Sequence, residues 1–473
     1  KEAKSTKLKF SKIQNKILAP HFVFYIKELL VQKYGQRFVE QGGLNVTTTL
    51  DLDLQEYAEA SVSGELDRLH NPTVTNGAAL VTKPGTGEIL AMVGSRNYFD
   101  DTHDGNVNVT ISKRQPGSSI KPINYATGLS KGYTAATPFV DQKVCFANIA
   151  GQAPYCPVNY DGKFHGVQQM RFALANSFNI PAVKMLKLNG VDSMIATASA
   201  MGISTFDSPD RYGLSLTLGG GEVMMTEMAE AFGVFANGGY RIPLQPILRV
   251  SDNKGKVMDE YKPPQSPIFG KRILDPGVAF IISEILRDNG ARGQAFGTNS
   301  VLQIGNFPVS VKTGTTNDYR DNWTIGYTPS YVVVAWVGNN DNKPMAGIVS
   351  GITGAAPMWH DIMAHLLEGT KPEPPSRPDD IVGKIVCSTS GLLPGGDCPT
   401  RFEYFIKGTE PKKFDPGKQK VFIDKSTGDL AKQGQLDNIE EKEQVIVTDP
   451  TGDRYCVDCP HPELLSPTPS SPH

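Results

Sequence analysis

Apolar residues in this chain gather in short runs separated by turn residues. Between residues 308 and 337, three runs rich in β-branched and aromatic residues follow one another with turn residues between them. This pattern is typical of antiparallel strands joined by turns. The sequence therefore predicts three successive strands, at Pro308–Lys312, Trp323–Tyr327 and Tyr331–Val337.

A helix is predicted from Ser118 to about Leu129, directly after the turn Gln115-Pro116-Gly117. Pro122 fits because the first helical turn tolerates a residue that has no N–H to donate. Three residues make nearly one helical turn, so Ser118 and Lys121 should project from the same face and meet.

The chain changes character after residue 370. Residues 371–378 are rich in proline and should form a stiff, extended linker. Short apolar runs between turn residues then predict a small strand-rich extension, with strands near Ile381–Cys387, Phe402–Ile406 and Val421–Ile423. The composition of residues 466–472 favours a disordered tail.

Composition limits the classes of function. With 473 residues, of which 39% are hydrophobic, the chain can bury a large core in one main domain with smaller appendages. Its net charge of −2 argues against nucleic acid as the main partner. Phosphate-binding, dinucleotide-binding and zinc-protease motifs are missing from the sequence. We expect no nucleic-acid partner, no cofactor and no metal.

Three short motifs carry the candidate chemistry: Ser118-x-x-Lys121, Ser177-x-Asn179 and Lys312-Thr313-Gly314. In this order they form the S-x-x-K, S-x-N and K-T-G set of serine acyl-transfer enzymes that penicillin acylates. Each motif alone has an ordinary alternative: a helix cap, a loop residue or a solvated strand end. Their order and their surroundings favour the functional interpretation.

The motif chemistry assigns roles to these residues. A hydroxyl needs a base to take its proton, and a lysine amine is a base only if burial or nearby positive charge keeps it neutral. Lys312 would supply such a charge to Lys121. The strand that ends in this K-T-G motif would offer backbone N–H groups to an extended peptide, with Gly314 allowing close approach. The hydroxyls expected to bind this substrate belong to Thr313, Thr315 and Thr316.

Ser119 is a rival nucleophile. It lies two residues from Lys121 and so on another face of the predicted helix.

The chain resembles the transpeptidase domain of class A, bifunctional penicillin-binding proteins over roughly residues 41–370. The resembling segments lie on both sides of the three motifs and include 42–55, 80–94, 114–118, 219–239, 315–329 and 355–359. The resemblance implies an α/β protein of the α+β type. It would have a central antiparallel five-stranded sheet flanked by helices, a helical subdomain and a small strand-rich C-terminal extension, as in the penicillin-binding and serine β-lactamase fold.

The resemblance also implies a function, namely D,D-transpeptidation of peptidoglycan stem peptides. Ser118 would attack the donor D-Ala-D-Ala bond, and an acceptor amine would then take the acyl group; β-lactam antibiotics would acylate the same serine. Ser177 and Lys312 would relay a proton to the leaving amine, and Asn179 would hold the substrate's amide. The backbone N–H groups of Ser118 and Thr315 would form the oxyanion hole.

Members of this family are anchored on the outer face of the bacterial plasma membrane and carry a glycosyltransferase domain. The sequence contains no run of eighteen apolar residues and no room for that second domain. We therefore expect a chain cut inside the linker. Its parts would be a linker region at 1–70, a transpeptidase domain at 71–370 and an extension at 371–473.

The six cysteines form three pairs that are close in sequence. Outside the cytoplasm, Cys145 with Cys156 and Cys387 with Cys398 are disulfide candidates, each worth about 3 kcal/mol. Cys456-x-x-Cys459 with His461 has the start of a zinc spacing, a minor alternative. Free thiols are the remaining possibility.

Two other classes of function share these motifs. A D,D-carboxypeptidase or β-lactamase-type hydrolase differs only in letting water attack the acyl-enzyme. A catalytically silent wall-binding module would keep the fold alone.

Residues 141–165 are expected to form an insertion near the active site.

Overall fold

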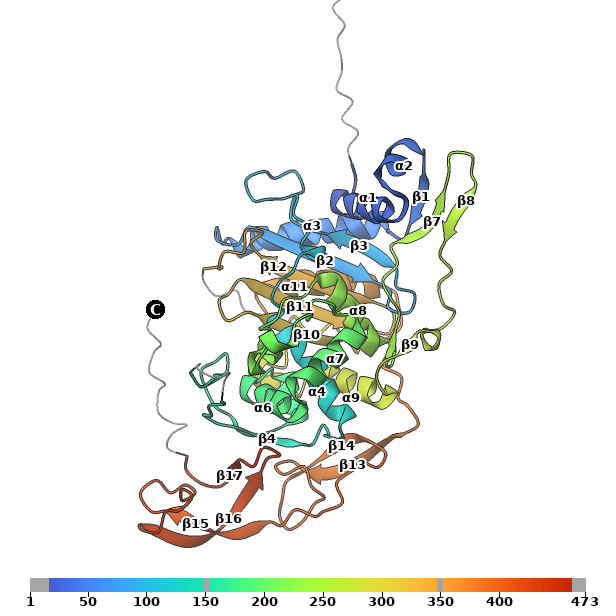
Figure 1. The fold of residues 1–473 in the computed structure, drawn as a ribbon. Helices are drawn as coiled ribbons and strands as arrows, with labels where there is room; N and C mark the ends of the chain where they lie inside the picture. The colour runs from blue at the N-terminus through green and yellow to red at the C-terminus, as the bar shows by residue number, and fades with distance from the viewer. Residues whose placement is uncertain (1–16, 148–152, 347–351, 462–473) are drawn as a thin grey trace, which may run out of the picture.

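The computed structural model describes residues 17–147, 153–346 and 352–461. Figure 1 shows the first helices at one end, a sheet with helices in the middle and the C-terminal strands at the other end. The basic residues before position 17 and the predicted tail at 466–472 lie outside the described residues.

The centre of the molecule is a five-stranded antiparallel sheet in the order β10-β11-β12-β2-β3. Its strands are β2 (Asn76–Thr82), β3 (Ile89–Val93), β10 (Ser310–Thr315), β11 (Asp321–Tyr327) and β12 (Val332–Gly338). The predicted strands at 308–337 correspond to β10, β11 and β12. Because β10 is at the edge of this order, its outer side has no strand partner among the described residues.

Both faces of the sheet are covered, which explains why all seven residues of β12 are buried. Side chains alternate across a strand, so Val333, Ala335 and Val337 join one core and Val332, Val334 and Trp336 join the other. The first core is closed by α3 (Leu52–Leu69) and α11 (Ala355–Leu367). The second is closed by helices that include α8 (Met225–Ala236) and α9 (Pro276–Arg287).

A helical layer on the second face carries the candidate chemistry. Its helices are α4 (Lys121–Ser130), α5 (Met170–Ala175), α6 (Asn179–Asn189), α7 (Val191–Met201) and α10 (Gly293–Phe296). Short 3₁₀ segments complete it and its surroundings: η2 (Val109–Ile111), η3 (Gly117–Ile120), η4 (Pro209–Arg211), η5 (Leu214–Leu218) and η6 (Pro267–Phe269).

The helix predicted from Ser118 begins with a 3₁₀ turn, and the α-helix starts at Lys121. Proline explains the difference. An α-helix starting at Ser118 would need an N–H at position 122 to bond to the Ser118 carbonyl, and Pro122 has none. The Lys121 N–H bonds to that carbonyl instead, which is the tighter 3₁₀ pattern.

The two ends of the chain form the periphery. The N-terminal part contains α1 (Pro20–Tyr34), α2 (Gln36–Gln41) and β1 (Asn45–Thr48). Strand β1 forms a small sheet with β7 (Ile247–Ser251) and β8 (Val257–Glu260), which come from the middle of the chain. Two-stranded pairs join β4 (Pro138–Asp141) to β5 (Gly166–Gln169), and β6 (Tyr240–Arg241) to β9 (Lys271–Arg272). The C-terminal strands are β13 (Ile381–Cys387), β14 (Thr400–Ile406), β15 (Lys418–Asp424), β16 (Ile439–Thr448) and β17 (Arg454–Cys456).

This architecture confirms the predicted α+β fold class, with its five-stranded antiparallel sheet, helical subdomain and strand-rich extension. Among the described residues, no helix combines the length and the apolar character needed to cross a membrane.

The cysteines differ in part from the prediction. Cys145 and Cys156 form a disulfide as predicted. The predicted Cys387–Cys398 bond is wrong for this structure: both are free thiols, and the Cys387 sulfur shares a hydrogen bond with the Thr389 hydroxyl at 3.2 Å. Cys456 and Cys459 are joined to each other, so their sulfurs are not available as the zinc ligands of the minor alternative.

Candidate active site

Ser118 and Lys121 lie at the junction between the 3₁₀ turn η3 and helix α4. The Ser118 side chain is half-buried, whereas Lys121 is fully buried. The rival Ser119 is also fully buried, and its hydroxyl donates to the Pro116 carbonyl at 2.7 Å. The serine that precedes Lys121 by one 3₁₀ turn is thus the more accessible of the two.

The Ser177 hydroxyl is contacted by both motif lysines, Lys121 and Lys312. Ser177 lies between α5 and α6 with φ of 63°, a left-handed conformation that is uncommon for a residue with a side chain. Lys312 Nζ donates to Ser177 Oγ at 2.9 Å, and Lys121 Nζ lies 3.5 Å from the same oxygen. Lys121 also donates to the Ser177 carbonyl at 2.6 Å. The structure therefore brings the three motifs together.

Burial and a nearby positive charge lower the pKa of both lysines and so favour the neutral amine. Burial, with the charge of Lys312 as the next cause, holds the pKa of Lys121 well below its usual range. Burial and the nearby Arg292 lower the pKa of Lys312 to about 7. A neutral Lys121 is what a general base for Ser118 requires.

Asn179 is the first residue of α6, and protein groups already bind its side chain. Its Oδ1 accepts from Lys121 Nζ at 2.7 Å, and its Nδ2 donates to the Val158 carbonyl at 2.7 Å. The expected contact with a substrate amide would thus use the second Nδ2 hydrogen or displace Val158.

The K-T-G strand β10 lies against the turn that carries Ser118. A Cβ added to Gly314 would lie 2.3 Å from the Pro116 carbonyl oxygen, and one added to Gly117 would lie 2.8 Å from the Thr315 nitrogen. Gly314 was expected to make room for substrate, but in the structure it makes room for the turn that carries Ser118. The Ser118 and Thr315 backbones are consequently close neighbours.

The threonines of the K-T-G segment differ in their surroundings. Thr313 and Thr315 alternate with Lys312 and Gly314 along β10, so they project from the other face of the strand. The Thr315 hydroxyl accepts from Asn322 Nδ2 at 3.3 Å. Thr316 follows the strand, and its hydroxyl accepts from the Arg320 and Asp321 N–H groups at 2.9 and 3.0 Å. Thr316 therefore closes the turn between β10 and β11.

A second layer of polar residues lies behind Asn179, and no motif in the sequence identified its members. Asn159 Oδ1 accepts from the Asn179 N–H at 2.7 Å, and the Asn159 amide donates to the buried Asp141 carboxylate at 2.7 Å. His165 Nδ1 contacts the same carboxylate at 2.8 Å. All three belong to segment 141–165, whose expected position near the site is the feature that points to them. The same segment reaches across to the K-T-G side, where the Tyr160 and Tyr319 rings lie 6.5 Å apart.

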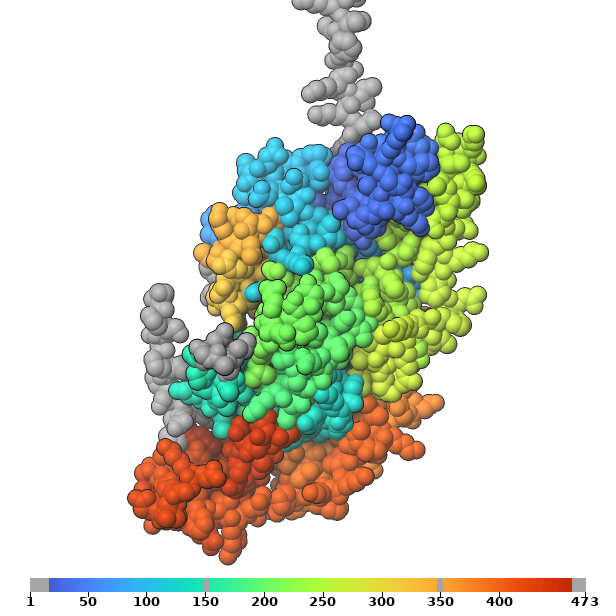
Figure 2. All heavy atoms as spheres, viewed as in Figure 1, coloured from blue at the N-terminus to red at the C-terminus, as the bar shows by residue number. Residues whose placement is uncertain are grey.

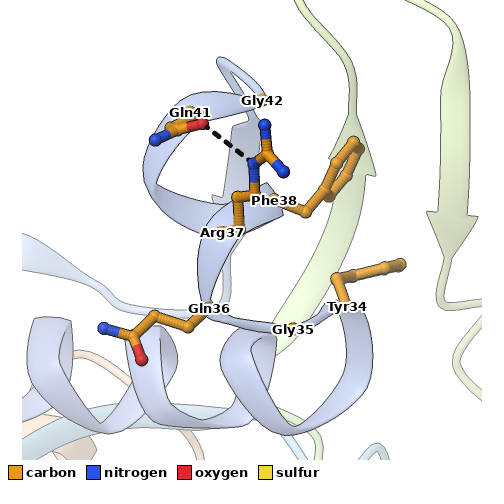
Figure 3. Close-up of a pocket in the computed structure, with 7 residues that line it drawn as sticks. All are labelled: Tyr34, Gly35, Gln36, Arg37, Phe38, Gln41 and Gly42. Carbon is orange, nitrogen blue, oxygen red and sulfur yellow. Dashed lines mark hydrogen bonds between the residues drawn. The ribbon is translucent and has the colours of Figure 1, made fainter.

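A separate pocket is lined by the end of α1 and by α2 (Figure 3). These two helices lie at the far end of the molecule from the C-terminal strands (Figure 1). The pocket has a volume of about 470 Å³ and is lined by Tyr34, Gly35, Gln36, Arg37, Phe38, Gln41 and Gly42. Its one charged side chain, Arg37, points to Gln41 at 3.4 Å. It lacks a cluster of perturbed titratable groups, so the motif site remains the candidate active site.

Comparisons with known proteins identify the family of this chain. The family described as the penicillin binding protein transpeptidase domain matches residues 77–364, and the C-terminal domain of penicillin-binding protein 1A matches residues 377–420. Penicillin-binding protein 1A of Neisseria lactamica is 32% identical over 310 residues, which cover 65% of this chain and 38% of that protein. Penicillin-binding protein 2D of Bacillus subtilis is 30% identical over 413 residues, covering 85% of this chain and 57% of that protein. The chain thus spans 38% and 57% of the length of these two relatives.

Solved structures show the same fold. Penicillin-binding protein 1A from Haemophilus influenzae superposes with a TM-score of 0.75 at 22% identity, covering 87% of this chain and 79% of that one. The PonA1 protein from Mycobacterium tuberculosis superposes with a TM-score of 0.63 at 20% identity, covering 76% of this chain and 96% of that one. With a family match over more than half of its length, this chain belongs to the penicillin-binding protein transpeptidase family.

Proposed function

We propose that this chain is a D,D-transpeptidase that cross-links peptidoglycan stem peptides through an acyl-enzyme on Ser118. The observation that carries the proposal is that the buried Lys121 and Lys312 side chains both contact the Ser177 hydroxyl. Lys121 follows Ser118 by one 3₁₀ turn. Family membership supports the reaction class, and the shift of both lysines toward neutrality supports the serine mechanism.

The first half of the reaction forms the ester. Ser118 Oγ attacks the carbonyl carbon between the two terminal D-alanines while Lys121 Nζ takes the hydroxyl proton. The backbone N–H groups of Ser118 and Thr315 hold the oxyanion, and removing one such donor typically costs about 10²–10³-fold in rate. Lys312 then gives a proton through Ser177 to the leaving amine, so the C–N bond breaks and free D-alanine departs.

The second half transfers the acyl group. Lys121 first passes the proton it took from Ser118 through Ser177 to Lys312, so that Lys121 is neutral again. An acceptor amine of a neighbouring stem peptide then attacks the ester carbonyl and loses a proton to Lys121. Lys121 gives that proton to Ser118 Oγ as the ester C–O bond breaks, which restores the hydroxyl. The open edge of β10 supports binding of the donor peptide as an added strand, since its backbone groups on that side have no strand partner among the described residues. Asn179, Thr313, Thr315 and Thr316 are the proposed polar contacts. No cofactor or metal takes part.

β-Lactam antibiotics are the proposed inhibitors. A strained lactam amide would acylate Ser118 in place of the peptide and leave a stable ester. The PonA1 structure with this fold was solved in complex with penicillin V, which supports a β-lactam site here.

We also infer the biological setting from the family. The longer protein would be membrane-anchored and linked to a glycosyltransferase domain, and this part would act at the extracytoplasmic face. The family matches at 77–364 and 377–420 support a transpeptidase domain at 71–370 between a linker region and an extension.

Mass spectrometry tests the proposal. After incubation with a penicillin, the intact chain should gain one adduct that peptide mapping places on Ser118. Ser118→Ala should abolish the adduct, whereas the control Ser119→Ala should keep it, because Ser119 is buried and bonded to Pro116. An adduct on the Ser118→Ala variant would overturn the assignment.

A second assay separates transfer from hydrolysis. With a D-Ala-D-Ala peptide and a D-amino acid acceptor, a transpeptidase yields the exchanged peptide. A product that ends only in free carboxylate would favour the carboxypeptidase alternative.

A further inference from the structure

A buried ion pair joins the C-terminal extension to the helix that begins with Asn179. Lys184 lies on α6, and its Nζ donates to Asp449 Oδ2 at 2.6 Å. Both side chains are fully buried. Figure 2 shows the C-terminal residues packed directly against the segments that carry β4 and the helical layer.

Asp449 also holds strand β4. The same Oδ2 atom accepts from the Val140 N–H at 3.0 Å. The other oxygen, Oδ1, accepts from the Thr451 N–H at 2.9 Å and from the Thr451 hydroxyl at 2.6 Å. Burial opposes the charge of Asp449, but its hydrogen bond with Lys184 keeps the pKa below its usual range. The carboxylate is therefore fixed by its own turn while it binds two separate elements.

Both of those elements lead to Asn179. Along α6, Lys184 lies within two turns of it. Along β4, the residue after Val140 is Asp141, whose carboxylate holds Asn159, which in turn accepts from the Asn179 N–H. Asp449 thus binds two elements, α6 and β4, and each of them is connected to Asn179. The side-chain oxygen of Asn179 accepts a hydrogen bond from Lys121.

Stability alone is a weak explanation for such a pair. Replacing a buried ion pair by well-packed apolar residues is often neutral or stabilising, so a buried pair is weak support for a purely stabilising role. The hydrogen bonds of Asp449 to α6 and β4 are better explained by a role in holding the S-x-N loop in place.

We propose that the C-terminal extension completes the active site and that Asp449 is a positioning residue, which holds the S-x-N loop through Lys184 and Val140. The inference rests on the proposed acylation of Ser118. It gives the extension a part in catalysis, although none of its residues named here touches the reacting atoms.

The chain offers a matched pair of variants. Asp449→Asn removes the negative charge. Both oxygens of Asp449 accept hydrogen bonds, so the NH₂ group of asparagine would face a hydrogen-bond donor in either orientation of the amide. Asp453→Asn makes the same change on the second partner of Lys184, which is 2.6 Å away but 35% exposed and does not bind Val140. Lys184 keeps Asp453 as a partner in Asp449→Asn, which favours folding of that variant.

Two measurements test the inference. The limiting rate of acylation by a fluorescent penicillin should fall roughly 10-fold to 100-fold in Asp449→Asn, because small misplacements of catalytic groups cost rates of this order. It should stay within about twofold of the unaltered chain in Asp453→Asn. Hydrogen exchange of segments 138–141 and 177–189 should rise in Asp449→Asn alone, a change that does not depend on penicillin.

The double variant Lys184→Met with Asp449→Asn covers the case in which the single variant does not fold, since it leaves neither group charged. It should fold and still acylate slowly. A folded Asp449→Asn or double variant with an unchanged limiting rate and unchanged exchange would overturn the inference. If the unaltered chain itself fails to acylate at Ser118, the proposed function fails, while the exchange data still decide whether Asp449 positions the loop.

Discussion

Gly314→Ala should damage the active site without touching a reacting group. The added Cβ would lie 2.3 Å from the Pro116 carbonyl oxygen and 2.9 Å from the Ser119 nitrogen. Ordinary contact begins near 3.4 Å, so β10 and the Ser118 turn must separate by about 1 Å. Neither neighbour is a flexible side chain, because both atoms belong to the backbone of η3 or its preceding turn.

That displacement sets the expected magnitudes. Overpacking a well-packed interior costs about 1–3 kcal/mol of the free energy of unfolding. A shift of about 1 Å between the nucleophile and the strand that carries Lys312 and Thr315 should lower the acylation rate about 10²-fold. The loss of rate should therefore greatly exceed what the loss of stability explains at a temperature where the variant is fully folded.

The assay is the limiting rate of acylation by a fluorescent penicillin, with urea unfolding of the same sample. Gly64→Ala is the matched control. Gly64 lies in the interior of α3 with open space around its Cβ position, so alanine there should raise stability slightly, by about 0.5–1 kcal/mol, and leave acylation unchanged. A folded Gly314→Ala variant that acylates within about twofold of the unaltered chain would refute the close packing of β10 on the Ser118 turn as a requirement for activity.

Two further predictions concern the buried charges. The limiting acylation rate should rise with pH as Lys121 loses its proton, and it should fall above about pH 7 as Lys312 loses the proton it donates. Arg292→Gln removes a charge that lowers the pKa of Lys312, so the fall in rate should move to higher pH. A fall at an unchanged pH would contradict the role assigned to Lys312. Glu403→Gln leaves the buried Arg171 without its bidentate carboxylate partner, so urea unfolding should show that the free energy of unfolding falls by about 3 kcal/mol. The double variant Glu403→Met with Arg171→Met should recover most of that stability. A loss below about 1 kcal/mol in Glu403→Gln would count against a tight interface between α5 and β14.

Local pattern was enough for much of the fold. The strands at 308–337 and β13, β14 and β15 of the extension were predictable because runs of β-branched and aromatic residues bounded by turns leave few alternatives, whereas β16 and β17 were not predicted. The helix after Gly117 was predictable for the same kind of reason, and only its first turn differed, because Pro122 lacks the N–H that an α-helix from Ser118 would use.

The motifs alone predicted Ser118 as the nucleophile and Lys121 as its base, and these roles stay predictions. Ser118 and Lys121 are three residues apart, so any helical conformation places them on one side. That placement follows from the backbone itself and needs no information about the rest of the chain.

Packing between distant segments decided the remainder. Lys312 reaches Ser177 across 135 residues of sequence and Lys121 reaches it across 56, and neither separation carries a local signal. The same holds for Gly314, whose close neighbour is the Ser118 turn, and for Asp449, which reaches α6 across 265 residues. The sequence by itself determined which residue types the chemistry has available and which elements carry them. Only the tertiary structure decided which of them meet, because desolvation and hydrogen bonding between them exist only once the sheet, the helices and the extension have packed.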